Sequence, residues 1–255
     1  MSTMYATLGP FGDAIDFIFH SRESQAGTVQ VGGLGEIWEL TWMHLKLSLA
    51  ATAIATLIAL PLGVWLGHLH RGSFLAINLG NIGRALPSLV IIAILIAPLG
   101  IGREALYVAL VILAVPVMLT NAYVAVDGVE EDVVDAARGM GLRGRQVLWQ
   151  AELPLALPLL FAGIRTAAVY VVATVPLGAL AGTDGGLGDI IVDQASYKLE
   201  GVIGAAICVA VLALAVDALF SLAQRLVTPR GLRSRVDHAE LQTEAAGGIP
   251  AAALP

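Results

Sequence analysis

Long apolar runs alternate with short polar stretches along most of this chain. A membrane-spanning helix needs about 20 mostly apolar residues, and five runs approach or exceed that length. We expect spans at about residues 42–66, 82–99, 104–126, 159–180 and 202–226. The pattern therefore predicts an all-α integral membrane protein with its transmembrane domain over residues 38–227.

Both ends of the chain lack such runs. Residues 1–37 predict an extracytoplasmic segment, with a short interfacial helix over 11–20 and a glycine-rich loop over 25–35. Because Asp13 and Asp16 stand where a basic leader would be, no cleavable signal is expected. Residues 228–255 carry Pro, Gly, Ala and scattered charge, which predicts a disordered tail.

A polar island over residues 127–158 separates the third and fourth spans. Three acidic residues, 130–132, suit the positive end of a helix dipole there. Gly139 and Gly141 favour a helix end, because glycine tolerates left-handed backbone. A second helical run over 146–153 should stop at Pro154 and Pro158. The island thus predicts two short helices with a glycine bend, and Arg143-Gly144 offers no capping side chain for the second.

Three of the five spans contain proline, at Pro87, Pro116 and Pro176. The carbonyls that proline leaves free are tolerated at membrane depth only where protein or a water-filled cavity satisfies them. These prolines therefore indicate either packing kinks or a translocation path, and both interpretations stay open. For Asn121, a structural hydrogen bond between helices is favoured over solute contact. The path candidates are Pro87, Ser88, Thr120, Asn121, Tyr123, Tyr170, Thr174 and Pro176.

Two charged residues lie deep in the last two spans, Arg165 and Asp217. Their expected depths from the same membrane face are similar, about 12–13 Å at 1.5 Å per residue. An unpaired charge there would cost several kcal/mol. We therefore predict an ion pair that joins the two helices, in preference to a proton-relay role for Asp217.

Composition agrees with a membrane protein and narrows the chemistry. Of the 255 residues 57% are hydrophobic and 13% charged, against about 25% charged in soluble domains. The net charge of -6 argues against a nucleic-acid partner, whereas the lipid bilayer is an expected one. Cys208 is the sole cysteine, and His68 with His70 supplies only two metal ligands. We predict no metal site, no bound cofactor and no enzymatic centre in this chain.

Basic residues indicate the orientation of the spans. One set of loops, which includes residues 127–158 and the C-terminus, holds most of the arginines. That set is Arg71, Arg138, Arg143, Arg145, Arg225, Arg230, Arg233 and Arg235. The opposite side holds only Arg22, Arg103 and Lys198 as clear loop cations. Because positive loops stay in the cytoplasm, we expect the N-terminus outside and the C-terminus inside.

The polar island also resembles a known motif. Asp135-Ala136-Ala137, then Gly141, then Glu152-Leu153-Pro154 is similar to the cytoplasmic signature loop of ABC importer permeases, with Asp135 in place of the usual Glu. The resemblance implies a coupling helix that docks into a groove on a separate ATPase subunit. The implied coupling residues are Asp135, Ala136, Ala137, Arg138, Gly139, Gly141, Glu152, Leu153 and Pro154.

Further blocks resemble the permeases of the osmoprotectant branch, which serves glycine betaine, choline and carnitine. They include residues 60–64, 86–89, 119–123, 136–141, 163–167 and 185–189. The resemblance implies a five-span type I permease that pairs with itself or a related permease. It implies two cytoplasmic ATPases, which carry ATP and Mg²⁺, and an extracytoplasmic solute-binding protein. Acidic residues Asp184, Asp189, Asp193 and Glu200 are candidates for docking that protein.

Two alternatives remain open. The first is an ABC permease for another small zwitterion, such as an amino acid or a thione betaine. The second is an ion-coupled secondary transporter, in which repeated halves and midplane ionisable residues are common. The absence of a repeat and the single plausibly paired acid weigh against the second alternative.

Overall fold

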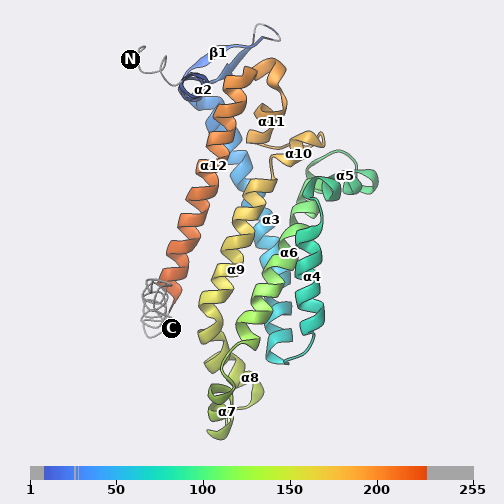
Figure 1. The fold of residues 1–255 in the computed structure, drawn as a ribbon, viewed down its shortest axis with the longest axis vertical. Helices are drawn as coiled ribbons and strands as arrows, with labels where there is room; N and C mark the ends of the chain where they lie inside the picture. Colours follow the sequence, from blue (N-terminus) through green and yellow to red (C-terminus); the bar gives the residue numbers. More distant parts are fainter. Residues whose placement is uncertain (1–8, 26, 28, 229–255) are drawn as a thin grey trace, which may run out of the picture.

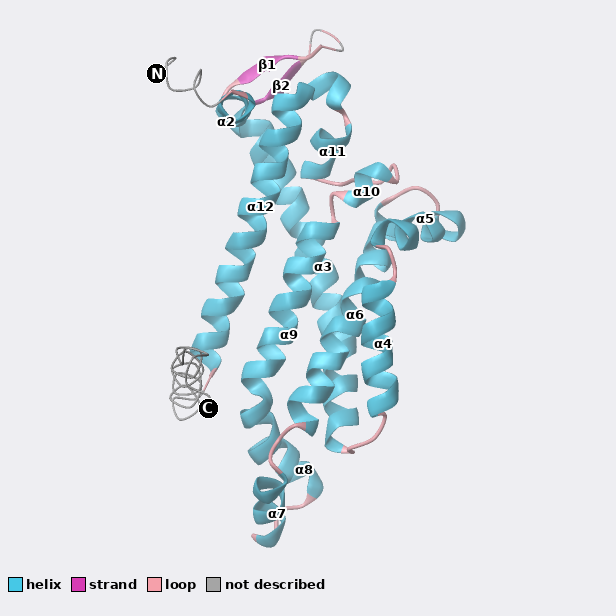
Figure 2. Cartoon of the chain, in the orientation of Figure 1, coloured by secondary structure: helices cyan, strands magenta, loops and turns pink. Residues whose placement is uncertain are grey.

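The computed structural model describes residues 9–25, 27 and 29–228, which form a long helical bundle (Figure 1). The only strands in these residues form a small hairpin at one end (Figure 2). In chain order the elements are α2 (Pro10–Phe19), β1 (Ser21–Glu23), β2 (Gln30–Gly32), α3 (Gly33–His68), α4 (Ser73–Ala85), α5 (Ser88–Leu99), α6 (Arg103–Asp127), α7 (Glu131–Gly139), α8 (Gly144–Val147), the π-helical segment η1 (Leu148–Glu152), α9 (Leu153–Thr174), α10 (Leu177–Leu180), α11 (Leu187–Val192) and α12 (Gln194–Val227).

Four helical stretches of the described chain are long and apolar enough to cross a membrane. They are Gly33–His68, Arg103–Asp127, Gly144–Leu180 and Gln194–Val227. A bent pair, Ala76–Gly83 with Ser88–Leu99, brings the number to five if it forms one span. The apolar pattern thus leads to the helical membrane architecture that the sequence predicts, with helices that extend past the expected span limits.

Small residues bring α3 and α6 close together. Ala51, Ala55, Ala59, Gly63 and Gly67 recur at every fourth position of α3, and all five are buried. A Cβ added at Gly63 would lie only 2.6 Å from a side-chain carbon of α6. Since helices in lipid associate through close packing, this stripe of small residues positions the two central helices of the bundle.

The predicted second span, 82–99, is broken at Pro87 into two helices. The chain forms α4, then Leu86 in extended backbone and Pro87 as the N-cap of α5, with a bend of 91° between the two helices. Proline disfavours helical backbone at the residue before it, and here Leu86 takes extended backbone, so α4 ends at Ala85. Because Gly80 and Gly83 have no side chain, α4 lies close to Thr120 and Pro116 of α6.

The expected helix end at Pro154 and Pro158 is wrong. The π-helical segment η1 leads directly into α9, and Pro154 lies in the first turn of α9. Proline is tolerated in a first turn because its missing N–H needs no partner there. Pro158 is accommodated inside α9, whereas Pro176 follows the true end of that helix at Thr174.

The expected glycine-rich loop over residues 25–35 is wrong from Gln30 onward. Strand β2 pairs antiparallel with β1, Val31 opposite Arg22, and α3 begins at Gly33. The hairpin forms because Val31 is buried against Phe17 of α2, which also packs edge-to-face on Tyr197 of α12. A small N-terminal cap therefore closes this end of the bundle.

The last helix, α12, contains one non-helical residue, Lys198, with φ 57°. From there it runs beside α9, and the figures show it at the edge of the bundle. The disordered tail predicted for residues 228–255 lies outside the described residues except for Thr228.

Candidate coupling site

The polar island forms the tip of the molecule at the end opposite the hairpin (Figure 1). Helix α7 begins with Glu131 and Asp132 in its first turn and ends with Arg138 in its last. These charges complement the helix dipole at both ends. Gly141 then takes left-handed backbone, with φ 89°, and turns the chain toward α8. The expected pair of short helices with a glycine bend is present, although Gly139 remains helical.

An apolar cluster inside the tip holds α7 against α8. Val134 and Ala137 of α7 pack on Val147 of α8, and each is at most 4% exposed. Ala137 is therefore part of the tip's own core, and the expectation that it offers a surface to a partner is wrong. Its small size serves the internal helix contact.

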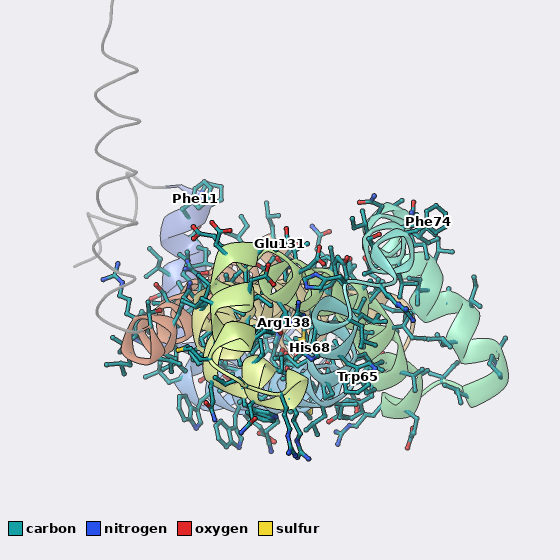
Figure 3. The ribbon with its side chains drawn as sticks, turned by 90° about the horizontal axis from the view of Figure 1, so that it is seen from below. Phe11, Trp65, His68, Phe74, Glu131 and Arg138 are labelled. Atoms are coloured by element: carbon teal, nitrogen blue, oxygen red, sulfur yellow. The ribbon has the colours of Figure 1, made fainter. Side chains whose placement is uncertain are left out.

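Five of the coupling candidates face outward on or after α7. They are Asp135, Ala136, Arg138, Gly139 and Gly141. Arg138 forms a 3.5 Å ion pair with Asp135 one turn earlier, and both side chains are more than half exposed. Figure 3, which views this end from below, shows Arg138 and Glu131 on its surface. A surface pair of this kind adds little stability, so these side chains are available to a partner.

Glu152, one of the implied coupling residues, is buried and anchors the end of the polar island to α3. Its side chain is 1% exposed, and its Oε2 lies 2.6 Å from Nδ1 of His68. Its Oε1 has no partner among the described residues. Leu153 and Pro154 are half-buried beside it. This contact could not be predicted from the sequence, because 84 residues separate Glu152 from His68.

Two histidines at the end of α3 attach both ends of the polar island to the spans. His68 contacts Glu152 where the island returns to the membrane. His70 lies 2.9 Å through Nδ1 from Oδ1 of Asp127, where the island leaves α6. The described residues contain no cluster of three or more potential metal ligands. The geometry assigns these histidines to linking the tip to the helices.

The N-terminus of α8 is capped in a way that the sequence analysis missed. The Gln146 side chain accepts a hydrogen bond from the Arg143 N–H at 2.9 Å. A side chain at the third helical position can satisfy the N-cap backbone in this manner. Gln146, three residues after Arg143, is the feature of the sequence from which this cap could have been predicted.

The path candidates are spread over three regions of the bundle. Pro87 and Ser88 lie at the break between α4 and α5, and Thr174 with Pro176 lies at the far end of α9. Tyr170 lies one turn before Thr174 and accepts its hydroxyl hydrogen bond through the backbone carbonyl.

The remaining candidates lie on α6. Thr120 donates a 2.8 Å hydrogen bond to the Ala76 carbonyl and so joins α6 to α4. Asn121 bonds its own helix and packs against Gly163 of α9, and Tyr123 is only 3% exposed. The hydrogen bond of Asn121 thus stays within α6, where one between helices was expected, whereas Thr120 and Tyr123 take part in contacts between helices.

The predicted pair of Arg165 and Asp217 is present. Arg165 donates two hydrogen bonds to the carboxylate, both of 2.6 Å, in a fork geometry. The pair joins α9 to α12 beside an apolar cluster that includes Ala168, Val172 and Val216.

At the hairpin end, the four acidic docking candidates all have partners within the chain. Asp184 pairs with Arg103, and Glu200 lies 3.6 Å from Arg22. Asp193 caps α12, and Asp189 accepts the Gly185 N–H. Burial raises the pKa of Asp189, against the opposing effect of that hydrogen bond. These acids therefore have structural roles whether or not they also meet a partner.

Comparison with known proteins decides the family. Residues 59–231 match the model of the binding-protein-dependent transport system inner membrane component. The chain belongs to this family. It is thus a multi-pass inner membrane transport component of ABC importers, and the family match covers the whole coupling tip.

Curated relatives and solved structures agree with this membership. The chain is 37% identical over 200 residues to the glycine betaine/carnitine/choline transport system permease protein OpuCB of Bacillus subtilis strain 168, covering 78% of this chain and 92% of the relative. It is 34% identical to the carnitine transport permease protein OpuCB of Listeria monocytogenes, covering 76% and 88%. An inward-facing structure of the MetNI methionine ABC transporter has the same fold, with TM-score 0.67, 23% identity and coverage of 75% and 97%.

Proposed function

We propose that this chain is the permease subunit of an ATP-driven importer for quaternary-ammonium osmoprotectants such as glycine betaine, choline and carnitine. The observation that carries this proposal is the family's signature segment, folded as an exposed tip that is anchored to the spans. The names of the relatives support the solute class. ATP and Mg²⁺ would bind the partner ATPase.

The outward face of α7 is the proposed docking surface for the ATPase. Asp135 and Arg138 give it charge of both signs, and Ala136 between them lets a partner approach closely. Glu152, through His68, would carry a displacement of the tip to the end of α3. Leu153 and Pro154 would carry the same displacement directly into α9.

The tip would lie in the cytoplasm. The tip, the turn between α3 and α4, and the end of α12 share one end of the bundle (Figure 2). Arg71, Arg138, Arg143 and Arg145 belong to that end, as the positive-inside rule requires for a cytoplasmic face. The hairpin cap would then face the solute-binding protein, and the N-terminus would lie outside.

A second permease, identical or related, would complete the translocation path, and each permease would bind one of two ATPases. The path would be lined from the proline-containing helices, with Thr120, Asn121 and Tyr123 able to change partners when α4, α6 and α9 move. Selection for quaternary ammonium would reside in an aromatic cage of the binding protein, where cation–π contacts are strongest.

An importer for another small zwitterion is the alternative within the family, and an ion-coupled secondary transporter is the alternative outside it. The MetNI likeness supports the fold alone. Binding measurements on the partner binding protein distinguish the proposal from an importer for another small zwitterion. They would show micromolar or tighter binding of a betaine under the proposal and of an amino acid under the alternative.

The coupling proposal is tested with Arg138→Glu in liposomes that hold the permease, its ATPase and the binding protein. Opposite charge on α7 should greatly reduce solute uptake while the ATPase continues to hydrolyse ATP, because docking and not folding is lost. Arg71→Glu is the matched control, since it lies in another loop at the same end. Coupled uptake at the parent rate in Arg138→Glu would contradict the docking role.

A further inference from the structure

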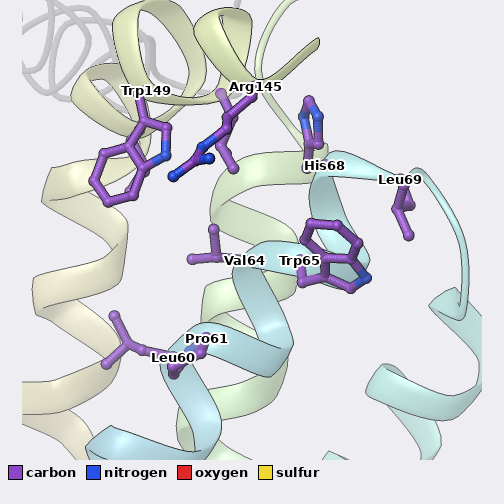
Figure 4. A pocket seen from close by; sticks show the side chains of 10 residues that line it. Leu60, Pro61, Val64, Trp65, His68, Leu69, Arg145 and Trp149 are labelled. Carbon is purple, nitrogen blue, oxygen red and sulfur yellow. The ribbon is translucent and has the colours of Figure 1, made fainter.

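An open groove lies between the end of α3 and the start of the returning chain at η1 (Figure 4). Its volume is about 790 Å³. Leu60, Val64 and Trp65 of α3 form one wall, and Arg145, Trp149 and Leu153 form the other. Figure 4 shows Arg145 and Trp149 reaching from the tip toward the α3 wall. The proposed coupling route uses two residues of its lining, His68 and Leu153, but gives no role to the groove itself.

The groove extends to membrane depth. Leu60 lies two turns before the end of α3 at His68, which is about 12 Å along the axis at 1.5 Å per residue. That wall belongs to an apolar span, so a soluble partner docked on the tip cannot reach it. Trp65 and Trp149 are 58% and 63% exposed at the mouth of the groove. Tryptophan prefers the headgroup level of a bilayer, so the groove opens into the edge of the lipid leaflet.

The mouth of the groove is cationic. In the part of the chain that the structure describes, no ion pair joins Arg143 or Arg145 to an acidic side chain. A second hollow of about 600 Å³ adjoins the groove and shares Arg145 and Trp149 with it. Arg143, Gln146 and Gln150 are also in the lining of that hollow. Arg145 thus lies between the apolar groove and a hollow with more polar side chains in its lining.

We propose that the groove binds one anionic phospholipid of the surrounding leaflet. The phosphate would contact Arg145, with Arg143 and Gln146 toward its headgroup, and one acyl chain would lie along Leu60 and Val64. An apolar slot at membrane depth with unpaired cations at its mouth matches an anionic amphiphile in both charge and polarity. The bound lipid would bridge α3 and η1, the two elements that His68 and Glu152 already join.

Quenching of tryptophan fluorescence tests this site in vesicles. The chain has four tryptophans, and Trp38→Phe with Trp42→Phe removes the two at the other end of α3. Trp65 and Trp149 then report on the groove. The vesicles contain phosphatidylcholine and phosphatidylglycerol, and one of the two lipids at a time carries bromine as the quencher. Comparing the two degrees of quenching gives the relative occupancy of the groove by the two lipids. At about 1 kcal/mol per basic residue, Arg145 alone should give about a fivefold preference for phosphatidylglycerol.

Charge variants identify the source of that preference. Arg145→Gln should reduce it toward equality, and Arg145→Lys should retain it and show that charge and not a folding defect is responsible. Arg71→Gln removes the same charge from this end outside both hollows and should leave the preference intact. No preference in the parent, or an equal fall in Arg71→Gln, would overturn the site. Competition by inorganic phosphate in millimolar amounts would assign a soluble-anion site and also overturn the lipid proposal.

Discussion

Removal of one partner from the Arg165–Asp217 pair should destabilise the bundle far more than removal of both. In Asp217→Leu the guanidinium of Arg165 loses both of its 2.6 Å hydrogen bonds. Arg165 lies about 18 Å into α9 at 1.5 Å per residue, too deep for its charge to reach water easily. A lone guanidinium at that depth in a bilayer costs about 3 kcal/mol.

Replacing both residues by leucine removes the unpaired charge together with the pair. Apolar replacement of a buried ion pair is often close to neutral, so Arg165→Leu/Asp217→Leu should cost less than either single change, about 1 kcal/mol. Each side chain is 35% exposed in the isolated chain, and that surface would face lipid or the second permease, so water offers little relief.

The free energy of unfolding in mixed micelles, measured by titration with sodium dodecyl sulfate, checks this cycle. Thr166→Leu on the same helix is the control, because Thr166 is exposed and bonds only its own helix. It should change the unfolding free energy by no more than about 0.5 kcal/mol. A double variant as unstable as the two single variants combined would refute the reasoning, since the charges would then act independently.

Three further predictions follow from local packing and burial. Ala137→Leu should lower the melting temperature by overfilling the core of the tip, at about 1–3 kcal/mol. Ala136→Leu, on the exposed face, should keep that temperature and lower only uptake. Gly63→Ala should destabilise by a similar amount because its Cβ meets α6 at 2.6 Å, while Gly35→Ala on the same helix meets nothing within 4 Å and should change stability little. Burial raises the pKa of Asp189 above 3.8, so the folded state binds its proton more tightly. Stability should therefore fall as pH rises through the window above about 4, and Asp189→Asn should remove that slope in thermal melts over pH 3.5–7.

The bundle was predictable because lipid imposes a simple rule on sequence. Four of the predicted spans lie within continuous helical stretches of the structure, and the ion pair follows from two opposite charges at equal depth. Span limits were less predictable. Helix α3 begins at Gly33, well before its apolar run, because the hairpin cap supports a polar first turn that hydropathy alone assigns to loop.

The roles of the residues in the tip were only partly predictable. The motif located the tip, but it did not indicate that Ala137 and Glu152, two of the implied coupling residues, are buried. Burial of Glu152 depends on His68, which comes from a distant part of the chain. The helix through Pro154 depends on the π turn before it. Neither the burial of Glu152 nor the helix through Pro154 can be predicted from a local sequence pattern, because each depends on how elements contact one another.

Uptake by reconstituted liposomes tests the central claim most directly. The permease, the ATPase and the binding protein are reconstituted with radiolabelled glycine betaine, and uptake is measured with ATP, without ATP, and with an imposed ion gradient alone. The account predicts accumulation that requires ATP and the ATPase and that Arg138→Glu abolishes. Accumulation driven by the ion gradient in the absence of the ATPase would contradict it.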